Sequence, residues 1–163
     1  MSKPLHVSYN WDTKKFLQGA KAAYDYELKN SRKRFLGWIF IALTQFGVVL
    51  ALKQGTIGML ALSTILVLYW YGFRWKIREY FLIKSFENSP LKDKKFEVKL
   101  NDEGLFFNDS PIDFKDIYEI VSTDEGVLLY FIDNYIFVPS SAFENLEDKS
   151  EFLKRIKRKI KEE

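Results

Sequence analysis

The stretch FLGWIFIALTQFGVVLAL, from Phe35 to Leu52, is apolar and uncharged, and a second such stretch, IGMLALSTILVLYWYGF, runs from Ile57 to Phe73. Only Lys53 to Thr56 separate them. As α-helices of 18 and 17 residues, they reach roughly 27 and 25 Å, close to the roughly 30 Å hydrocarbon core of a bilayer. The sequence therefore predicts a transmembrane helical hairpin with spans 35–52 and 57–73.

The alternative is a buried hairpin inside a soluble all-α protein. A chain of 163 residues has little material with which to cover two apolar helices on every side. Aromatic side chains also gather toward one end of the hairpin, where amphipathic rings favour the headgroup layer. These are Trp38, Tyr69, Trp70, Tyr71 and Trp75. The membrane interpretation is favoured.

Basic residues flank the hairpin asymmetrically and predict its orientation. One base, Lys53, lies between the spans. The flanking bases are Lys29, Arg32, Lys33 and Arg34 before the first span, and Arg74, Lys76, Arg78 and Lys84 after the second. Both termini are therefore expected in the cytoplasm. The first 34 residues have no apolar core typical of a removable signal peptide. The absence of cysteine fits a reducing compartment and excludes disulfides and thiolate metal sites.

Four small or polar residues are candidates for packing within the hairpin: Gln45, Gly47, Ser63 and Thr64. Antiparallel pairing of the spans brings Gln45 to a depth similar to that of Ser63 and Thr64. An interhelical hydrogen bond there would contribute about 0.6 kcal/mol and help to define the register. Neither span contains an ionisable group, which argues against conduction or transport. Whether the hairpin self-associates is left open.

Helical periodicity extends the hairpin on both sides. Asp12 or Thr13 can cap a helix, and we expect its apolar stripe to pack against that of Arg74 to Asn88. The two stripes are Phe16, Leu17, Ala20, Tyr24 and Leu28, and Ile77, Tyr80, Phe81 and Phe86. The segment before Asp12, with the single histidine His6, is expected to be irregular. The first predicted domain therefore comprises residues 1–89.

Beyond Pro90 the apolar period changes to two, which is typical of strands. Turn clusters divide this region into short strands, and Asn108-Asp109-Ser110, which matches a glycosylation sequon, is interpreted as a turn. A closing helix follows a cap region at Ser140 or Ser141. The predicted strands are 96–100, 105–107, 117–123, 127–132 and 135–138, and the helix stripe is Leu146, Lys149, Leu153, Ile156 and Ile160. The predicted fold class is α+β: a membrane hairpin, then a small antiparallel sheet or partly open barrel at 90–163, closed by a helix.

Three parts of this region carry a family pattern: Leu105-Phe106-Phe107, the runs 112–120 and 127–131, and Phe137-Val138-Pro139 with the following Ser140 to Phe143. In these runs and in its architecture, the chain resembles the YcxB-like family of small bacterial membrane proteins. Phe114 stands where the family usually has tryptophan, and Ser140 where a basic residue is expected. The resemblance implies two membrane spans followed by a cytoplasmic pleckstrin-homology-like (PH-like) domain, in the bacterial inner membrane. It supplies no catalytic residues.

Charge is distributed unevenly along a chain whose net charge is +3. Residues 96–148 carry a net charge of −11, so the sheet should repel nucleic acid and anionic headgroups and attract a basic protein partner or another copy. Asp113, Asp116 and Glu119 are the candidate partner-binding residues. The closing helix is basic, and its candidate membrane-surface residues are Lys154, Arg155, Lys157, Arg158 and Lys161. Alternatively, these bases face water or pair with the acidic sheet.

An enzyme is not predicted. The sequence has no Gly-rich phosphate loop and no metal-ligand cluster, and acidic pairs such as Asp113 with Asp116 lie at turns. We therefore expect no catalytic, cofactor-binding or metal-binding residues, no small-molecule substrate and no nucleic-acid partner. The expected partners are the lipid bilayer and a protein.

Two functions remain open. In the first, the hairpin anchors an acidic interaction or scaffold module at the membrane. In the second, the protein is a bacterial immunity-type protein whose hairpin binds an incoming toxin inside the membrane. The first depends on Asp113, Asp116 and Glu119, and the second on Gln45, Gly47 and the lipid-facing spans.

Overall fold

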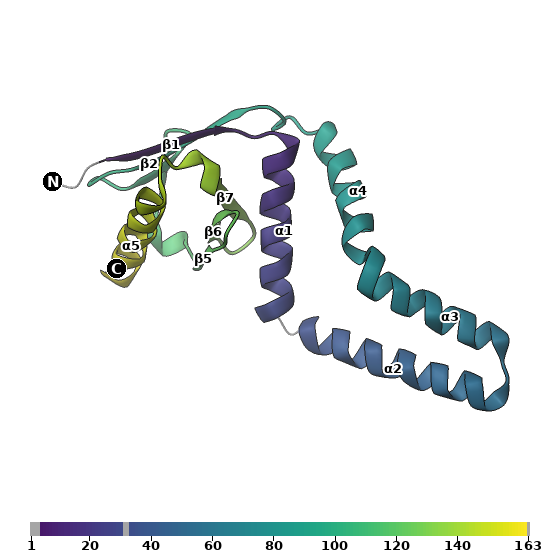
Figure 1. Cartoon of the computed structure of the whole chain (residues 1–163). Coiled ribbons are helices and arrows are strands. Elements are labelled where there is room, and N and C mark those ends of the chain that lie inside the picture. Colours follow the sequence, from purple (N-terminus) through teal and green to yellow (C-terminus); the bar gives the residue numbers. More distant parts are fainter. Residues whose placement is uncertain (1–3, 31–32, 163) are drawn as a thin grey trace. The chain divides into compact units, whose positions relative to one another are not determined.

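The computed structural model describes residues 4–30 and 33–162 (Figure 1). Arg32, which the orientation argument uses, lies outside this set, as do the side chains of Lys33, Arg34 and Tyr71. The described residues form helices and antiparallel strands, which confirms the α+β class. The helices are α1 (Thr13–Asn30), α2 (Lys33–Gln54), α3 (Ile57–Leu68), α4 (Arg74–Glu87) and α5 (Leu146–Glu162). A π-helix, η1 (Tyr69–Phe73), joins α3 to α4, and two 3₁₀ turns are η2 (Phe114–Asp116) and η3 (Ser140–Ala142).

The strands form two antiparallel sheets, one of four strands and one of three. The first has the order β1-β2-β3-β4, with β1 (Leu5–Asn10), β2 (Lys95–Leu100), β3 (Leu105–Phe107) and β4 (Ser110–Ile112). The second has the order β5-β6-β7, with β5 (Glu119–Ser122), β6 (Gly126–Tyr130) and β7 (Tyr135–Pro139).

Strand β1 corrects the prediction of an irregular N-terminal segment. Leu5, Val7 and Tyr9 point into the core while the residues between them are exposed, and Leu5 pairs with Leu100 of β2. The alternation of apolar and polar residues was visible over these six residues and should have predicted a strand. Strand β4 was also missed because Pro111 lies in it, and proline is confined to edge strands. In the order above, β4 is indeed at the edge.

The turn between β3 and β4 confirms the interpretation of Asn108-Asp109-Ser110. Phe107 pairs with Ser110, so Asn108 and Asp109 form a two-residue hairpin loop. Both have positive φ angles, 50° and 62°, as a type I′ turn requires.

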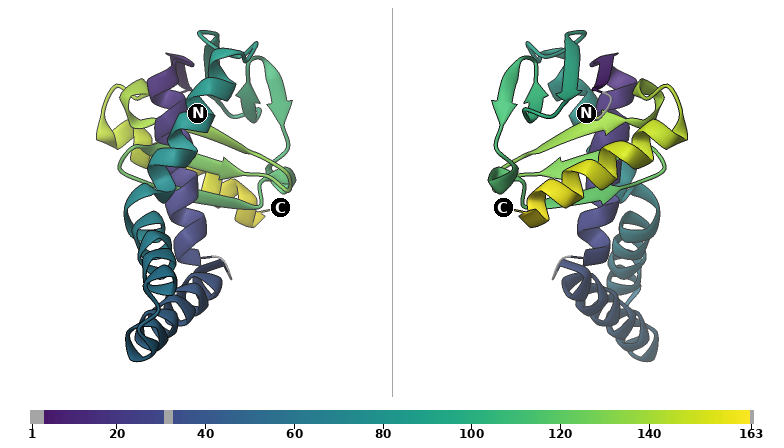
Figure 2. Two further views of the ribbon diagram at one scale, coloured as in Figure 1. Left: turned by 90° about the vertical axis from the view of Figure 1, so that its right-hand side faces the viewer. Right: turned by 90° about the vertical axis from the view of Figure 1, so that its left-hand side faces the viewer.

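One hydrophobic core joins both sheets and α5. Its fully buried members come from every layer: Val98 and Leu105 from the four-stranded sheet, Val127 and Val138 from the three-stranded sheet, and Ile156 from α5. Figure 2 shows α5 crossing the strands on one side. Burying a Phe or Ile side chain is worth about 1.5–3 kcal/mol, so α5 is an integral layer of this fold.

The N-terminal part of α1 packs on the other face of the three-stranded sheet. Ala22 and Ala23 form a second buried cluster with Leu128 and Phe137. A Cβ atom on Gly19 would lie 2.8 Å from the Phe137 ring, so only glycine allows this approach. Asp12 caps α1 by accepting a hydrogen bond from Lys15 N at 2.8 Å, as predicted.

Helix α5 does not begin where the sequence suggested. Ser140 lies in η3, and the Asn145 side chain accepts from Asp148 N at 2.7 Å. The predicted cap region at Ser140 or Ser141 is therefore wrong, because Asn145 occupies the position directly before the helix. Phe152, buried in the core, also belongs to the apolar stripe, whereas Leu146 is exposed.

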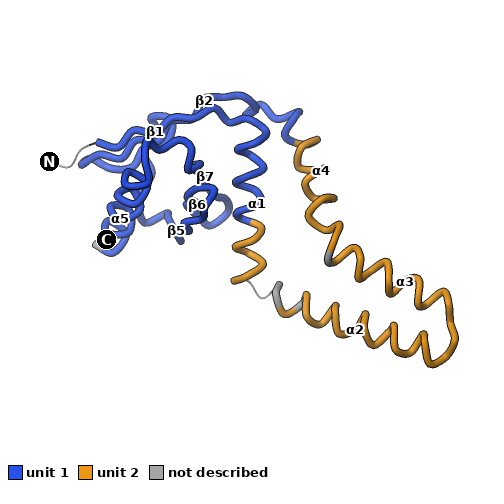
Figure 3. Tube along the Cα trace, viewed as in Figure 1, with its two compact units in different colours: residues 1–23, 86–163 blue, residues 24–85 orange. Residues whose placement is uncertain are grey.

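The chain divides into two compact units that do not follow chain order (Figure 3). Unit 1 contains residues 1–23 and 86–163, and unit 2 contains residues 24–85. The predicted boundary at 89/90 places β1 with the hairpin, whereas the structure groups β1 with β2. Unit 2 is thus an insertion between two paired strands of unit 1.

Unit 2 contains the hairpin, with α2 packed along α3. Trp70 of η1 fits against Gly37, where a Cβ atom would lie 2.7 Å from the indole ring, and stacks on Phe40 at 5.0 Å. Within the described residues, α2 is the one helix long and apolar enough to cross a membrane, over Gly37–Gln54; α3 has 12 residues. The chain nevertheless stays helical through η1 into α4.

Each unit contains an aromatic contact between a residue of α1 and a residue of α4. In unit 1, Phe16 and Phe86 stack with ring centroids 4.3 Å apart. In unit 2, Tyr24 packs at 5.2 Å from Trp75. Of the expected contacts between the two stripes, Phe16 with Phe86 is present, whereas Ile77, Tyr80 and Phe81 are exposed. Trp75, the partner of Tyr24, was not part of the predicted stripe.

Candidate functional site

A groove of about 550 Å³ lies between the start of β5 and the outer side of α5, within unit 1. This volume is in the range of small-ligand pockets, roughly 300–1,000 Å³. One wall comes from Tyr118, Glu119 and Ile120, and the other from α5. The α5 residues are Lys154, Lys157, Arg158, Ile160 and Lys161. The groove therefore combines an apolar lining with a basic rim.

The β5 wall is held in place by the preceding 3₁₀ turn. Asp113 accepts a hydrogen bond from Lys115 N at 3.0 Å and so caps η2. Ile117 is buried, and Tyr118 N donates to Tyr130 O at 2.8 Å. Because successive side chains of an extended segment point to opposite sides, the Tyr118 ring is directed outward and is 80% exposed.

The α5 wall follows from helical geometry. Lys154, Lys157, Arg158 and Lys161 are spaced i, i+3, i+4 and i+7, which places them on one face of the helix. The core anchors Phe152 and Ile156 are buried. The basic face is therefore fixed by the packing of α5 on the sheets.

The predicted membrane-surface residues of α5 lie on two different faces of the helix. Four of them line the groove, while Arg155 forms an i,i+4 ion pair with Glu151 on another face. Among the described residues, Lys154, Lys157 and Lys161 form no hydrogen bond or ion pair. With Glu119 as the one acid in the lining, the groove carries a net charge of +3.

The predicted acidic residues have different positions. Asp113 caps η2 and Asp116 is exposed in that turn. Glu119 is half-buried in β5 and lines the basic groove. The structure thus places one of the three acids beside the bases of α5, on the side of the sheet that the alternative interpretation of these bases had allowed.

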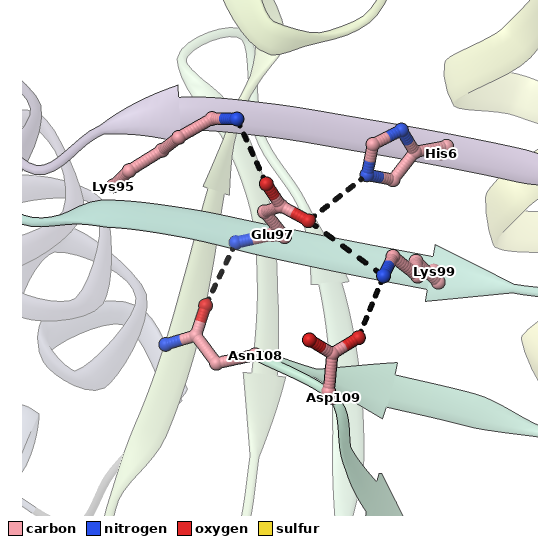
Figure 4. Close-up of polar contacts among 6 residues, drawn as sticks. All are labelled: His6, Lys95, Glu97, Lys99, Asn108 and Asp109. Carbon is pink, nitrogen blue, oxygen red and sulfur yellow. Dashed lines mark hydrogen bonds and ion pairs between the residues drawn. The ribbon is translucent and has the colours of Figure 1, made fainter.

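A second polar cluster lies on the outer face of the four-stranded sheet (Figure 4). Glu97 on β2 contacts Lys95 at 2.8 Å, Lys99 at 3.7 Å and His6 at 3.4 Å, and Lys99 contacts Asp109 at 2.6 Å. Hydrogen bonds from Lys95 and His6 lower the pKa of Glu97. Exposed ion pairs of this kind contribute little, so we interpret the cluster as cross-strand pairing that fixes the register.

Lys149 forms a third, structural cluster. Its side chain is largely buried, and its ammonium donates to Thr123 O at 2.7 Å and to Ser140 Oγ at 2.8 Å. Burial lowers the Lys149 pKa, an effect that Asp124 opposes. Lys149 thereby ties α5 to the turn between β5 and β6 and to η3.

In the hairpin, Gly47 and Ser63 face each other, since a Cβ atom on Gly47 would lie 3.0 Å from Ser63 Oγ. Thr64 donates to Leu60 O at 2.8 Å within its own helix. Gln45 is exposed, and Thr44, which sequence reasoning overlooked, is buried and donates to Phe40 O at 2.6 Å. Helix–helix contact thus uses Gly47 and Ser63.

Sequence reasoning missed Tyr118, Ile120 and Ile160 as groove residues. Ile160 was assigned to the core stripe and the two others to a strand. The signal for Tyr118 was its position next to a buried isoleucine in a segment with a two-residue period, which directs it outward.

The comparisons with known proteins concern this same unit. Residues 100–154 match the family model described as YcxB-like protein. This segment is YcxB-like. The match confirms the family recognised from the sequence, and it covers β3 to β7 and the first half of α5. No curated protein and no solved structure gives a significant match.

Proposed function

We propose that this YcxB-like protein is a non-catalytic, membrane-anchored interaction module. A two-span hairpin holds a PH-like unit at the cytoplasmic face of the bacterial inner membrane. The observation that carries the proposal is the pairing of β1 with β2 across the inserted hairpin.

The pairing restricts how the chain can cross a bilayer. Strands β1 and β2 belong to one sheet, so residues 10 and 95 must lie on the same side of any membrane. A chain that leaves and returns to one side crosses an even number of times. If α2 crosses, the segment Ile57–Phe73 must cross back, and its helical continuity through η1 gives it roughly 25 Å of length.

The surfaces of α2 and α3 support a lipid environment. Only 17% of the window Gly37–Gln54 is buried within the structure, whereas a core helix of a soluble protein is largely buried. Leu43, Phe46 and Leu62 are each more than half exposed. An apolar surface this extensive marks an interface with lipid or protein.

The architecture of unit 1 supports the PH-like assignment. Sheets of four and three strands enclose one core, and a C-terminal helix packs against them. A non-catalytic module acts through the surface that it presents to a partner. We propose that the acidic surface around the exposed Asp116 binds a basic protein partner.

Cysteine labelling tests the topology, since the native chain contains no cysteine. Gln54→Cys places a thiol at the end of α2, and Ser150→Cys places one at an exposed position of α5. A membrane-impermeant maleimide added to intact cells should label Gln54→Cys, and Ser150→Cys only after permeabilisation. Labelling of both positions only after permeabilisation, with release of the protein by alkaline carbonate, would contradict membrane anchoring.

The acidic surface is tested separately by affinity capture from gently solubilised membranes. Asp116→Lys should lose a partner that the wild-type protein retains, whereas the matched variant Asp133→Lys, at an exposed turn between β6 and β7, should retain it. Equal capture by wild type and both variants would contradict a role for this surface.

A further inference from the structure

The groove between β5 and α5 gathers positive charge on one face of a helix. Its four bases are spaced i, i+3, i+4 and i+7, and like charges at these spacings destabilise a helix. Elsewhere on α5, Arg155 has the favourable partner Glu151 one turn away. On the groove face the helix concentrates positive charge, with Glu119 as the one acid of the lining.

The groove also has an apolar part that restricts which ligands fit it. Tyr118 and Ile160 lie at the surface between the bases, and the alkyl stems of lysine and arginine extend the apolar wall. A ligand that fits this lining has an anionic head and an apolar body. Phosphate is a head that Lys and Arg bind well together.

We propose that the groove binds the headgroup of an anionic phospholipid. Its phosphate would lie among Lys154, Lys157 and Arg158, and the glycerol and first acyl carbons would lie against Tyr118 and Ile160. Charge complementarity and the apolar lining together select this occupant, because a lipid joins an anionic head directly to an apolar body, whereas a free phosphate uses only the bases. The inference rests on the proposed function in one respect: the bilayer that anchors the hairpin supplies the lipid.

The test is native mass spectrometry of the full chain in neutral detergent, with equimolar phosphatidylglycerol and phosphatidylcholine as probes. Wild type should retain one phosphatidylglycerol in preference to phosphatidylcholine. Lys157→Glu should weaken this retention about tenfold, since the change removes a base that attracts the anionic lipid and adds a carboxylate that repels it. Tyr118→Ala should weaken it about threefold.

Two matched controls separate the groove from general charge and hydrophobicity. Lys159→Glu makes the same charge change on the same helix but lines a different cavity, beside Asp113. Ile132→Ala removes an exposed apolar side chain, 90% accessible, at the turn between β6 and β7. Both should bind within about twofold of wild type. Circular dichroism should show the same fold for all four variants, since the substituted side chains are not in the core.

Three results would overturn the proposal. The first is equal retention of the two lipids, and the second is equal loss in Lys157→Glu and Lys159→Glu, which would indicate net charge alone. The third is displacement of the lipid by glycerol phosphate or an acidic peptide at concentrations matching the lipid, which would indicate a site for a free anion or a protein. Because the assay uses detergent, it measures lipid binding to the groove independently of membrane anchoring. Its result therefore stands whether or not the cysteine labelling confirms that anchoring.

Discussion

Helices α5 and α2 place their apolar side chains in contrasting environments. In α5, Phe152 and Ile156 are 1% and 0% exposed, and charged residues cover the remaining faces. In α2, Leu43 and Phe46 are 66% and 63% exposed, and the sequence from 35 to 52 has no charge. An amphipathic helix needs a protein partner on one side, whereas a uniformly apolar helix needs an apolar medium around it. The comparison teaches that the fold of unit 1 covers the apolar side of α5, whereas α2 keeps an exposed apolar surface that fits the membrane span proposed for it.

The largest expected effect is on the core beneath α5. Phe152→Ala should reduce the free energy of unfolding of unit 1 by about 3–5 kcal/mol, because it removes a fully buried ring. Phe46→Ala in α2 should change it by less than about 1 kcal/mol. Urea unfolding in neutral detergent, followed by near-ultraviolet circular dichroism, measures both. Equal destabilisation by the two variants would remove the distinction between the helices.

A charge placed in α2 tests its apolar medium. Leu43→Lys should cost about 2.5–3.5 kcal/mol for insertion near the middle of a span, and it should lower the membrane-bound fraction in cell fractionation. The control Leu146→Lys adds the same charge at an exposed position in the first turn of α5 and should leave the fraction unchanged. Full membrane retention of Leu43→Lys would argue that α2 does not face lipid.

The third prediction concerns the hydrogen bonds by which Lys149 connects α5 to neighbouring segments of unit 1. Lys149→Met should destabilise unit 1 by about 1–3 kcal/mol, because Thr123 O and Ser140 Oγ lose a donor. Lys154→Met, at an exposed position, should have little effect. Thermal unfolding of unit 1 ranks the two variants, and equal unfolding temperatures would contradict this role for Lys149.

The lowered pKa of Lys149 makes the free energy of unfolding of unit 1 depend on pH. Burial holds it below the usual 10.5 in the folded protein, so between the lowered value and 10.5 the unfolded chain binds more protons. Stability from this group therefore rises with pH across that window. The slope should be smaller in Lys149→Met, and identical slopes in the two proteins would contradict the direction of the shift.

The smallest expected effect concerns the contact between α2 and α3. Gly47→Leu should force the helices apart at Ser63 and cost about 1–3 kcal/mol of overpacking, some of it relieved by movement in the membrane. Gly58→Leu is the matched control, since open space surrounds that Cβ position. Disulfide crosslinking between cysteines introduced on the two helices should fall only in Gly47→Leu; an equal fall in both variants would contradict a specific contact.

Periodicity predicted the local elements well, and the long-range arrangement poorly. The two-residue period after Pro90 led to β2, β3 and β5 to β7, and the capping carboxylate of Asp12 was correctly placed. Strand β1 was missed because its partner β2 lies beyond the whole hairpin, and no local pattern shows that separation.

The candidate site shows the same limit. The basic residues of α5 were identified from their sequence run, but their spacing did not show which of them line a groove. That required the position of β5, which brings Glu119 and Tyr118 to the same face. The helical spacing did separate Arg155 from Lys154, Lys157, Arg158 and Lys161, and that signal was available from the sequence.

The insertion of the hairpin between β1 and β2 has a consequence for synthesis. β1 leaves the ribosome first, but Leu5, Val7 and Tyr9 have no strand partner until residues 95–100 have been made. During that interval the proposed membrane insertion of α2 and α3 would take place. The four-stranded sheet could then form only if the hairpin brings β2 to the same side of the membrane as β1. A chain whose hairpin inserts incorrectly would keep an unpaired strand, a form that proteases and chaperones can distinguish from the finished protein.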